Sequence, residues 1–530
     1  MIAQTRRNGS RIGYAKNLDE NMSYPLLSPR TLEHVQEHMR PPFWTWSSLR
    51  FQTAIYLGIT TLVFCLMRNS MSMAMVDIVA KNTTDASEDP LYVMDWSGDQ
   101  QAQVHTSFYV AGIFSVAGSQ YAVRKFGPKN VLSFGLLLNC IGSVLTPIAA
   151  VFLRHHLFIV LIRLVMGFGF EKSTAMAIFT IGNQVGIAVA MLLTAKLCQI
   201  PAFGGWPISF ELYAVLGLIF TLAWHLNMAD KPRESKHITA SELDYIQGRR
   251  TRRSRANTLV VKTPYKKILT NGCVVSICLC SFAQSFVGVA LITYLPKYNQ
   301  KAMKMSLNNN GIWSAMPFIT QTVTKMLFGV IADRIKARKV DVTTVTKASN
   351  AIASFGAALC IGIVTILPIE QTQAIQVLIA TSMALFSAYV PGYNTSLVTV
   401  APQFTAFISA YSQFYAQAAA TLAPIIIGNI TKNDTIEEWK LAFTILTATL
   451  VVSGISFQLF GHGRTESWGE PASLASSTRQ STCQPDEAKR LNLELHNSNL
   501  NLDPFPYRVC RTQTKTSSCC QKKWKTWKTT

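Results

Sequence analysis

Long apolar runs separated by short polar stretches dominate this sequence. About twelve such runs occur, near residues 53–78, 104–123, 130–152, 157–170, 173–199, 206–228, 271–295, 307–331, 344–368, 373–398, 403–430 and 440–460. A helix needs about twenty apolar residues to cross a bilayer, whereas helices of soluble proteins average about 11–12 residues and are amphipathic. The pattern therefore predicts an all-α membrane protein with about twelve transmembrane helices.

The charged residues support this reading by their scarcity and their placement. Only 15% of the 530 residues are charged, although the net charge is +21. The positive charge is concentrated in a few loops, and segment 231–267 between the sixth and seventh runs carries eleven Lys and Arg residues. Loops of the other parity are acidic or mixed. The positive-inside rule then places both termini and the central loop in the cytoplasm, and the lipid bilayer, not nucleic acid, is the expected partner. A phosphate-binding role for 249–255 stays as an alternative to a topology signal.

These assignments divide the chain into five parts. They are a cytoplasmic tail (1–50), a first transmembrane half (51–228), a basic cytoplasmic loop (229–270), a second transmembrane half (271–460) and a disordered cytoplasmic tail (461–530).

Glycosylation sequons and cysteines fit the same topology. Asn82-Thr-Thr and Asn433-Asp-Thr fall in loops expected to face outward, where Asn82 and Asn433 would be available to glycosylation. The eleven cysteines lie in apolar runs or in the C-terminal tail, so a disulfide framework is not expected. The first fifty residues lack an apolar core, which predicts that the first span acts as the targeting signal.

Two arginines interrupt the apolar runs. Arg68 lies within 53–78 and Arg163 within 157–170. A guanidinium stays protonated, and placing one at bilayer depth costs about 2.5–3.5 kcal/mol on insertion scales. Both side chains are therefore expected to face a cavity or a partner, which suggests a pathway for an anion. A purely structural interhelical role is the alternative.

A short repeat indicates two related halves. Ala122-Val-Arg124 ends the second run and Ala332-Asp333-Arg334 ends the eighth, 210 residues apart. Equivalent motifs in two six-span halves are typical of secondary transporters.

Longer strings resemble one branch of a known family. Arg68-Asn-Ser-Met-Ser-Met-Ala-Met-Val-Asp-Ile-Val, the segment His237-Ile-Thr-Ala-Ser-Glu-Leu-Asp-Tyr-Ile and Thr431-Lys-Asn-Asp-Thr-Ile-Glu-Glu-Trp are similar to the major facilitator branch that holds sialin, the vesicular glutamate transporters and the type I sodium–phosphate cotransporters. The resemblance covers roughly 50–460. It implies the major facilitator fold and transport of a small anion.

The resemblance also implies roles for individual residues. Arg68, His105 and Arg163 match cavity positions used for anion recognition and for proton or ion coupling, although His105 has an ordinary hydrogen-bonded reading as well. Gln284 stands where the glutamate transporters carry an additional arginine, and Asn394 keeps the family's asparagine in the tenth span.

The same resemblance assigns a gate at the cytoplasmic ends of the repeat. Arg124, Asp333 and Arg334 match the gating motif, with Val123 in place of an expected aspartate.

The fourth span departs from the family pattern. About fourteen apolar residues from Leu157 to Phe170 would rise only about 21 Å, and some twenty residues that relatives carry before Glu171 are absent. The alternative to a transporter is therefore a non-transporting membrane binding or regulatory relative.

The sequence favours a secondary active transporter of a small organic or inorganic anion, coupled to protons or sodium, in the plasma membrane or a lysosomal or vesicular membrane. No enzyme motif and no P-loop occur, so neither catalysis nor a cofactor or metal is expected. Lys325, deep in the eighth span, reads equally as a cavity residue or as part of a local polar patch.

Overall fold

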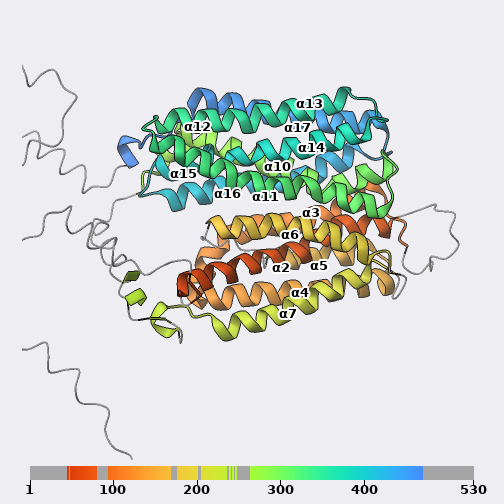
Figure 1. Cartoon of the computed structure of the whole chain (residues 1–530). Helices are drawn as coiled ribbons and strands as arrows, with labels where there is room; N and C mark the ends of the chain where they lie inside the picture. The colour runs from red at the N-terminus through yellow and green to blue at the C-terminus, as the bar shows by residue number, and fades with distance from the viewer. Residues whose placement is uncertain are drawn as a thin grey trace, which may run out of the picture. The chain divides into compact units, whose positions relative to one another are not determined.

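A computed structural model describes residues 45–46, 48–79, 93–168, 176–200, 205–235, 238–239, 241–243, 245–246 and 263–469. The first half contains α2 (Leu49–Ile78), α3 (Gly98–Phe126), α4 (Pro128–Leu153), α5 (His156–Phe168), α6 (Met176–Leu197) and α7 (Pro207–Asn227). The second half contains α9 (Tyr265–Thr270), α10 (Gly272–Lys301), α11 (Leu307–Ala337), α12 (Val342–Ala351), α13 (Ala357–Ile366), α14 (Thr372–Phe386), α15 (Tyr393–Thr399), α16 (Thr405–Ile430) and α17 (Ile436–Phe460). Short turns η2 (Pro232–Glu234) and η5 (Ser467–Gly469) lie outside these helices. Figure 1 shows the two halves as neighbouring groups of roughly parallel rods.

The predicted membrane character is confirmed. Within the described ranges, eight helical segments are long and apolar enough to span a bilayer, and His156–Phe168 and 182–197 are shorter apolar helices. The helices α3 and α16 are also long, 29 and 26 residues, but more polar. Together these segments give six transmembrane segments in each half. In the second half, η3 (Ile352–Gly356) connects α12 to α13, and η4 (Ser387–Tyr389) follows α14 and leads to α15.

Local sequence signals explain where several helices begin. Capping boxes start α3 at Ser97 and α17 at Thr435. In each, the hydroxyl accepts from the backbone N–H three residues later, and the Gln or Glu side chain of that later residue accepts from the backbone N–H of the Ser or Thr. Asn271 caps α10 by accepting from the backbone of Val274. Such caps satisfy the N–H groups that the first turn of a helix leaves without partners.

The outward faces of the helices are apolar. Exposed large side chains include Phe134, Phe152, Leu218, Val323 and Leu459. In water so many exposed apolar residues would be unfavourable, whereas hydrocarbon accepts them, so the surface pattern matches a protein that lies in lipid.

The halves touch through matching helix pairs, α3 with α16 and α6 with α11, and α2 also contacts α10. Glycines make both close crossings possible. A Cβ on Gly428 of α16 would lie 2.6 Å from the Cβ of Ala102, and one on Gly311 of α11 would lie 2.4 Å from the Cβ of Ala195. Each pair needs a glycine because the backbones approach too closely for a side chain.

We call the end of the bundle at which α3 ends and α4 begins the basic end, since Arg124, Lys125 and Lys129 lie there. Two polar contacts between the halves lie at the opposite end. Lys432 pairs with Asp99 at 3.1 Å, and Gln300 donates to the carbonyl of Val76 at 3.4 Å. The halves are thus held together at the end opposite the basic loops.

Glu242, in the segment between the halves, contacts the start of the first half. The Glu242 carboxylate accepts from the Ser48 hydroxyl at 2.8 Å, from the backbone N–H groups of Leu49 and Arg50 at 2.9 and 3.2 Å, and from Nε of Arg50 at 2.9 Å. The residue is 1% exposed. Its carboxylate therefore caps the start of α2, where the Ser48 side chain makes no cap of its own.

The described part of the fourth span is α5, whose 13 residues rise about 20 Å. The expected truncation point between Phe170 and Glu171 lies outside the described residues. Despite its length, α5 packs on both α3 and α4.

Candidate functional site

The two intramembrane arginines meet around one aromatic ring. Phe108, on α3, has the guanidinium carbon of Arg68 at 5.9 Å and that of Arg163 at 5.4 Å from its ring centroid. Arg68 also lies 5.9 Å from the ring centroid of Tyr109. Cations over aromatic faces are attracted by the ring quadrupole, so α3 supplies a platform for both charges.

Arg163 is the more deeply buried of the two. Its side chain is 2% exposed, and Nη1 and Nη2 donate to the backbone carbonyl of Arg68 at 3.4 and 3.3 Å. Its Nε has no hydrogen-bond partner among the described residues. Arg68 is half-buried, and its Nε donates to Asn69 at 3.2 Å. Arg163 thus ties α5 to α2, as the interhelical alternative expects, while a cavity role for the two arginines stays a prediction.

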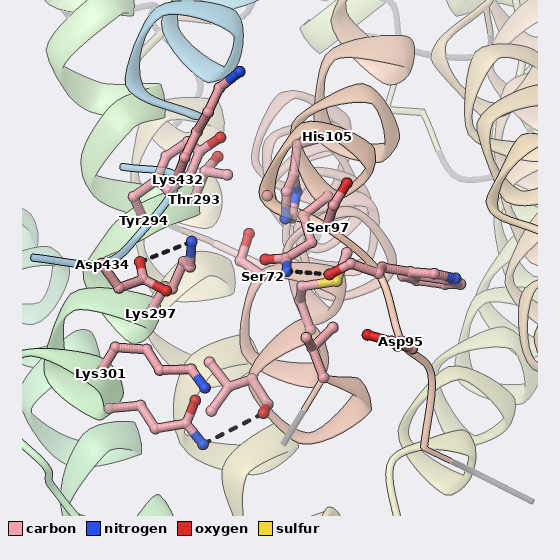
Figure 2. Close-up of a pocket in the computed structure, with 17 residues that line it drawn as sticks. Ser72, Asp95, Ser97, His105, Thr293, Tyr294, Lys297, Lys301, Lys432 and Asp434 are labelled. Atoms are coloured by element: carbon pink, nitrogen blue, oxygen red, sulfur yellow. Dashed lines mark hydrogen bonds and ion pairs between the residues drawn. The ribbon is translucent and has the colours of Figure 1, made fainter. Parts of the chain in front are cut away.

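His105 lies one turn before Phe108 on α3, so the two side chains share a face of that helix. It is 5% exposed, and its ring centroid is 6.3 Å from that of Tyr294 on α10. His105 lines a cavity of about 240 Å³ between the two halves. Figure 2 shows its side chain among the residues that line this cavity. The histidine thus stands between the arginine platform and this cavity.

The cavity near His105 has charged walls. Its lining includes Lys297, Lys301, Lys432, Asp95 and Asp434. Lys297 pairs with Asp434 at 2.9 Å and donates to the carbonyl of Thr431 at 3.3 Å, so part of this charge is already neutralised (Figure 2). The cavity lies at the end opposite the basic loops, where the halves are tied together. It is therefore a vestibule on that side of the arginines.

The two predicted residues of the second half are brought together by a residue that sequence reasoning missed. Tyr393, at the start of α15, donates its hydroxyl hydrogen to Oε1 of Gln284 on α10. Asn394 follows it directly, and its Nδ2 donates to the carbonyl of Tyr389 at 3.3 Å. The Gly392-Tyr-Asn string could have pointed to Tyr393, but a tyrosine in an apolar run is usually an ordinary packing residue.

The predicted gate residues are exposed at the basic end. The Asp333 side chain is 83% exposed, and its carboxylate pairs with Lys336 of the same helix at 4.0 Å. Arg124 and Arg334 are exposed as well. Their gating role stays a prediction, for a conformation in which the halves approach at this end.

The remaining predicted positions are outside the arginine platform. Asn433 is exposed just before α17, and its Nδ2 donates to Glu438 at 2.9 Å. Asn82 lies outside the described residues. Lys325 is half-buried on α11, next to Thr324, whose hydroxyl bonds the Ser387 hydroxyl at 2.8 Å.

Comparison with known proteins decides the family. The model of the Major Facilitator Superfamily matches residues 57–424. The chain belongs to the Major Facilitator Superfamily. Sialin of Ovis aries is 25% identical over 459 residues, covering 79% of this chain and 91% of its own. Vesicular glutamate transporter 1 of Bos taurus is 23% identical, covering 80% of this chain and 79% of its own.

Solved structures of this superfamily share the fold. The inward-open xylose transporter XylE of E. coli matches with a TM-score of 0.56 at 13% identity, covering 77% of this chain and 96% of its own. The major facilitator fold and the resemblance to the branch of sialin and the vesicular glutamate transporters are both confirmed. The chain is a multi-pass membrane protein related to transporters.

Proposed function

We propose that this protein carries a small organic or inorganic anion across a membrane by alternating access, with a proton or sodium gradient as the driving force. Rocking of the two halves would expose the region between them first to one side and then to the other. Polar ties at one end of the bundle and an exposed gate motif at the other support one such end state.

One observation carries the proposal. Arg163 is a buried cation that contacts a backbone carbonyl and an aromatic ring, and no carboxylate in the described part of the chain pairs with it. A buried charge without a counter-ion is costly, and an anion beside Arg68 and Arg163 would compensate it. Arg68, being half-buried, would contact the anion, while Arg163 would hold Arg68 in place and add positive potential.

His105 is our candidate for the coupling proton. Imidazole is the side chain that changes charge near neutral pH, and His105 lies between the vestibule and the arginine platform. A proton that enters through the vestibule would add positive charge near Phe108 and favour an anion there. Gln284 and Asn394 would supply neutral hydrogen-bonding groups from the second half.

The positive-inside rule supports an orientation with the basic end in the cytoplasm. The vestibule would then open to the outside or to the lumen of a lysosome or vesicle. The alternative, a relative that has lost transport, is not favoured, because the named relatives are transporters and the short α5 still positions Arg163 against Arg68.

Uptake into reconstituted vesicles tests the proposal. Labelled carboxylates, glutamate and phosphate are offered to wild type under imposed proton and sodium gradients. We expect concentrative uptake of at least one anion, and a loss of at least tenfold for Arg68→Lys, because an ammonium cannot reproduce the two-pronged guanidinium contact. Arg338→Lys, at an exposed position after α11, is the matched control and should transport normally. Failure of wild type to move any anion, or normal uptake by both Arg68→Lys and Arg163→Lys, would overturn the proposal.

A further inference from the structure

The hydroxyl of Tyr393 on α15 is hydrogen-bonded to the side chain of Gln284 on α10. We propose that Tyr393 is a positioning residue that fixes the amide of Gln284, so that its N–H group is the donor which the second half offers to an acceptor oxygen of the transported anion. This inference rests on the proposed function and names the group that selects the substrate in that half.

The phenol of Tyr393 has little freedom to move. Its side chain is 3% exposed, and its ring packs edge-on against Tyr389 with centroids 5.4 Å apart and planes at 74°. The hydroxyl reaches across from α15 to α10 and bonds Oε1 of Gln284. Gln284 itself is only half-buried, so its side chain is held by this bond and keeps some exposure.

The direction of this hydrogen bond follows from the groups that make it. The amide oxygen of Gln284 can only accept, so the Tyr393 hydroxyl is the donor and its single hydrogen goes to Oε1. The carbonyl oxygen of Gln284 is thereby occupied. Its Nε2 is left as a donor.

This hydrogen bond has a chemical consequence. A donor on the amide oxygen polarises the amide, so the Tyr393 hydroxyl strengthens the donor character of the Gln284 N–H groups. A neutral N–H suits an oxygen of a carboxylate, a phosphate or a hydroxyl, and it disfavours a group that can only donate. The first half would then supply positive charge through Arg68, and the second half would supply an oriented hydrogen-bond donor through Gln284.

The test separates the phenol hydroxyl from tyrosine packing. Tyr393→Phe removes one oxygen and keeps the ring, and Tyr389→Phe is the matched control, since the Tyr389 hydroxyl bonds Ser354 at 2.9 Å and Ser453 at 3.4 Å. We expect the uptake KM for the transported anion to rise about fivefold in Tyr393→Phe, with little change in maximal rate or in thermal unfolding. Tyr389→Phe should leave KM within about twofold of wild type.

Two further variants identify the group that Tyr393 acts on. Gln284→Ala should raise KM at least as much as Tyr393→Phe, and adding Tyr393→Phe to Gln284→Ala should raise it no further, because the hydroxyl then has nothing to position. Gln284→Glu keeps the acceptor for Tyr393 but replaces the donor by a charged oxygen, so it should abolish uptake.

The outcomes are distinguishable from those of the proposed function. An unchanged KM in Tyr393→Phe, an equal rise in Tyr389→Phe, additive effects in the double variant or normal uptake by Gln284→Glu would each overturn the role of Tyr393 while wild type still transports an anion. If wild type transports none, the proposed function fails and this inference falls with it.

Discussion

The cap that Glu242 places on the first transmembrane helix makes a sharp prediction. The carboxylate bonds four donors, and two of them are backbone N–H groups of Leu49 and Arg50 in the first turn of α2. In Glu242→Gln the amide oxygen takes the place of one carboxylate oxygen, and its NH₂ group faces the N–H of Leu49. One buried donor is orphaned and the ionic bond to Arg50 loses its charge.

The magnitude follows from those contacts. An orphaned buried donor costs about 1–3 kcal/mol, and a hydrogen bond to a charged group is worth about 1.5–3 kcal/mol. We therefore expect Glu242→Gln to lower the free energy of unfolding of α2 by about 3 kcal/mol. Hydrogen exchange of residues 49–52 in detergent-solubilised protein should speed up by about a hundredfold, because 1.4 kcal/mol is a factor of ten.

A matched control lies in the same linker. Glu234 pairs with Lys231 at 3.0 Å, but both side chains are largely exposed, so Glu234→Gln should change neither exchange nor the melting temperature. Equal exchange at residues 49–52 in the two variants would refute the capping role of Glu242.

The pH dependence of this contact has a defined sign. Burial raises the pKa of the Glu242 carboxyl, but the hydrogen bonds from Arg50, Leu49 and Ser48 outweigh it and hold the pKa below its usual range. A group whose pKa is lowered on folding stabilises the protein above its unfolded pKa, and this contribution is lost as pH falls through the lower, folded pKa. Protection of α2 should thus persist at mildly acidic pH and fall only in stronger acid, and Glu242→Gln should remove that acid-dependent step.

Two further predictions concern the contact between the halves and the sequons. Gly428→Leu should reduce uptake at least tenfold, because the new side chain would meet Ala102 and push α16 away from α3. Gly329→Leu is the matched control, since a Cβ there has open space around it, and equal uptake in the two variants would contradict the close crossing of α3 and α16. Protein expressed in animal cells should carry glycans that endoglycosidase removes and lose this mobility shift when Asn82→Gln and Asn433→Gln are combined; a shift that persists would place the glycans elsewhere.

Element type and number were predictable from the sequence because one physical requirement fixes them. A segment such as 272–301 must satisfy its backbone hydrogen bonds internally in hydrocarbon, which leaves the helix as its only open-ended form. Breaks inside spans were not predictable. A hydrogen bond between Ser354 and Tyr389 joins two such breaks, the π-helical turn Ile352–Gly356 and the 3-10 turn Ser387–Tyr389. No residue pattern in either segment predicts the break or the hydrogen bond.

Some site residues could be predicted from the sequence and others could not. Arg68 and Arg163 could be, because a charge is costly in an apolar run. Phe108, the ring that both contact, could not be, because it is one apolar residue among many in the sequence. The Glu242 contact spans more than 190 positions, so local patterns carry no trace of it. The sequence thus shows which charged residues cost free energy to bury, and only the tertiary structure shows which groups contact them.

The asymmetry between the halves bears on specificity. The first half gathers its charge at Arg68 and Arg163, while the second half contributes the neutral hydrogen-bonded pair of Tyr393 and Gln284. Coulombic attraction acts on any anion and falls slowly with distance, so it selects by charge and hardly by shape. A buried donor left without its acceptor is penalised strongly, so it discriminates between anions that do and do not place an oxygen there. The first half would therefore set mainly the strength of anion binding, and the second half the choice among anions. Substitutions at Gln284 should change the order of affinities for different anions, whereas substitutions at Arg68 should lower the affinity for all of them.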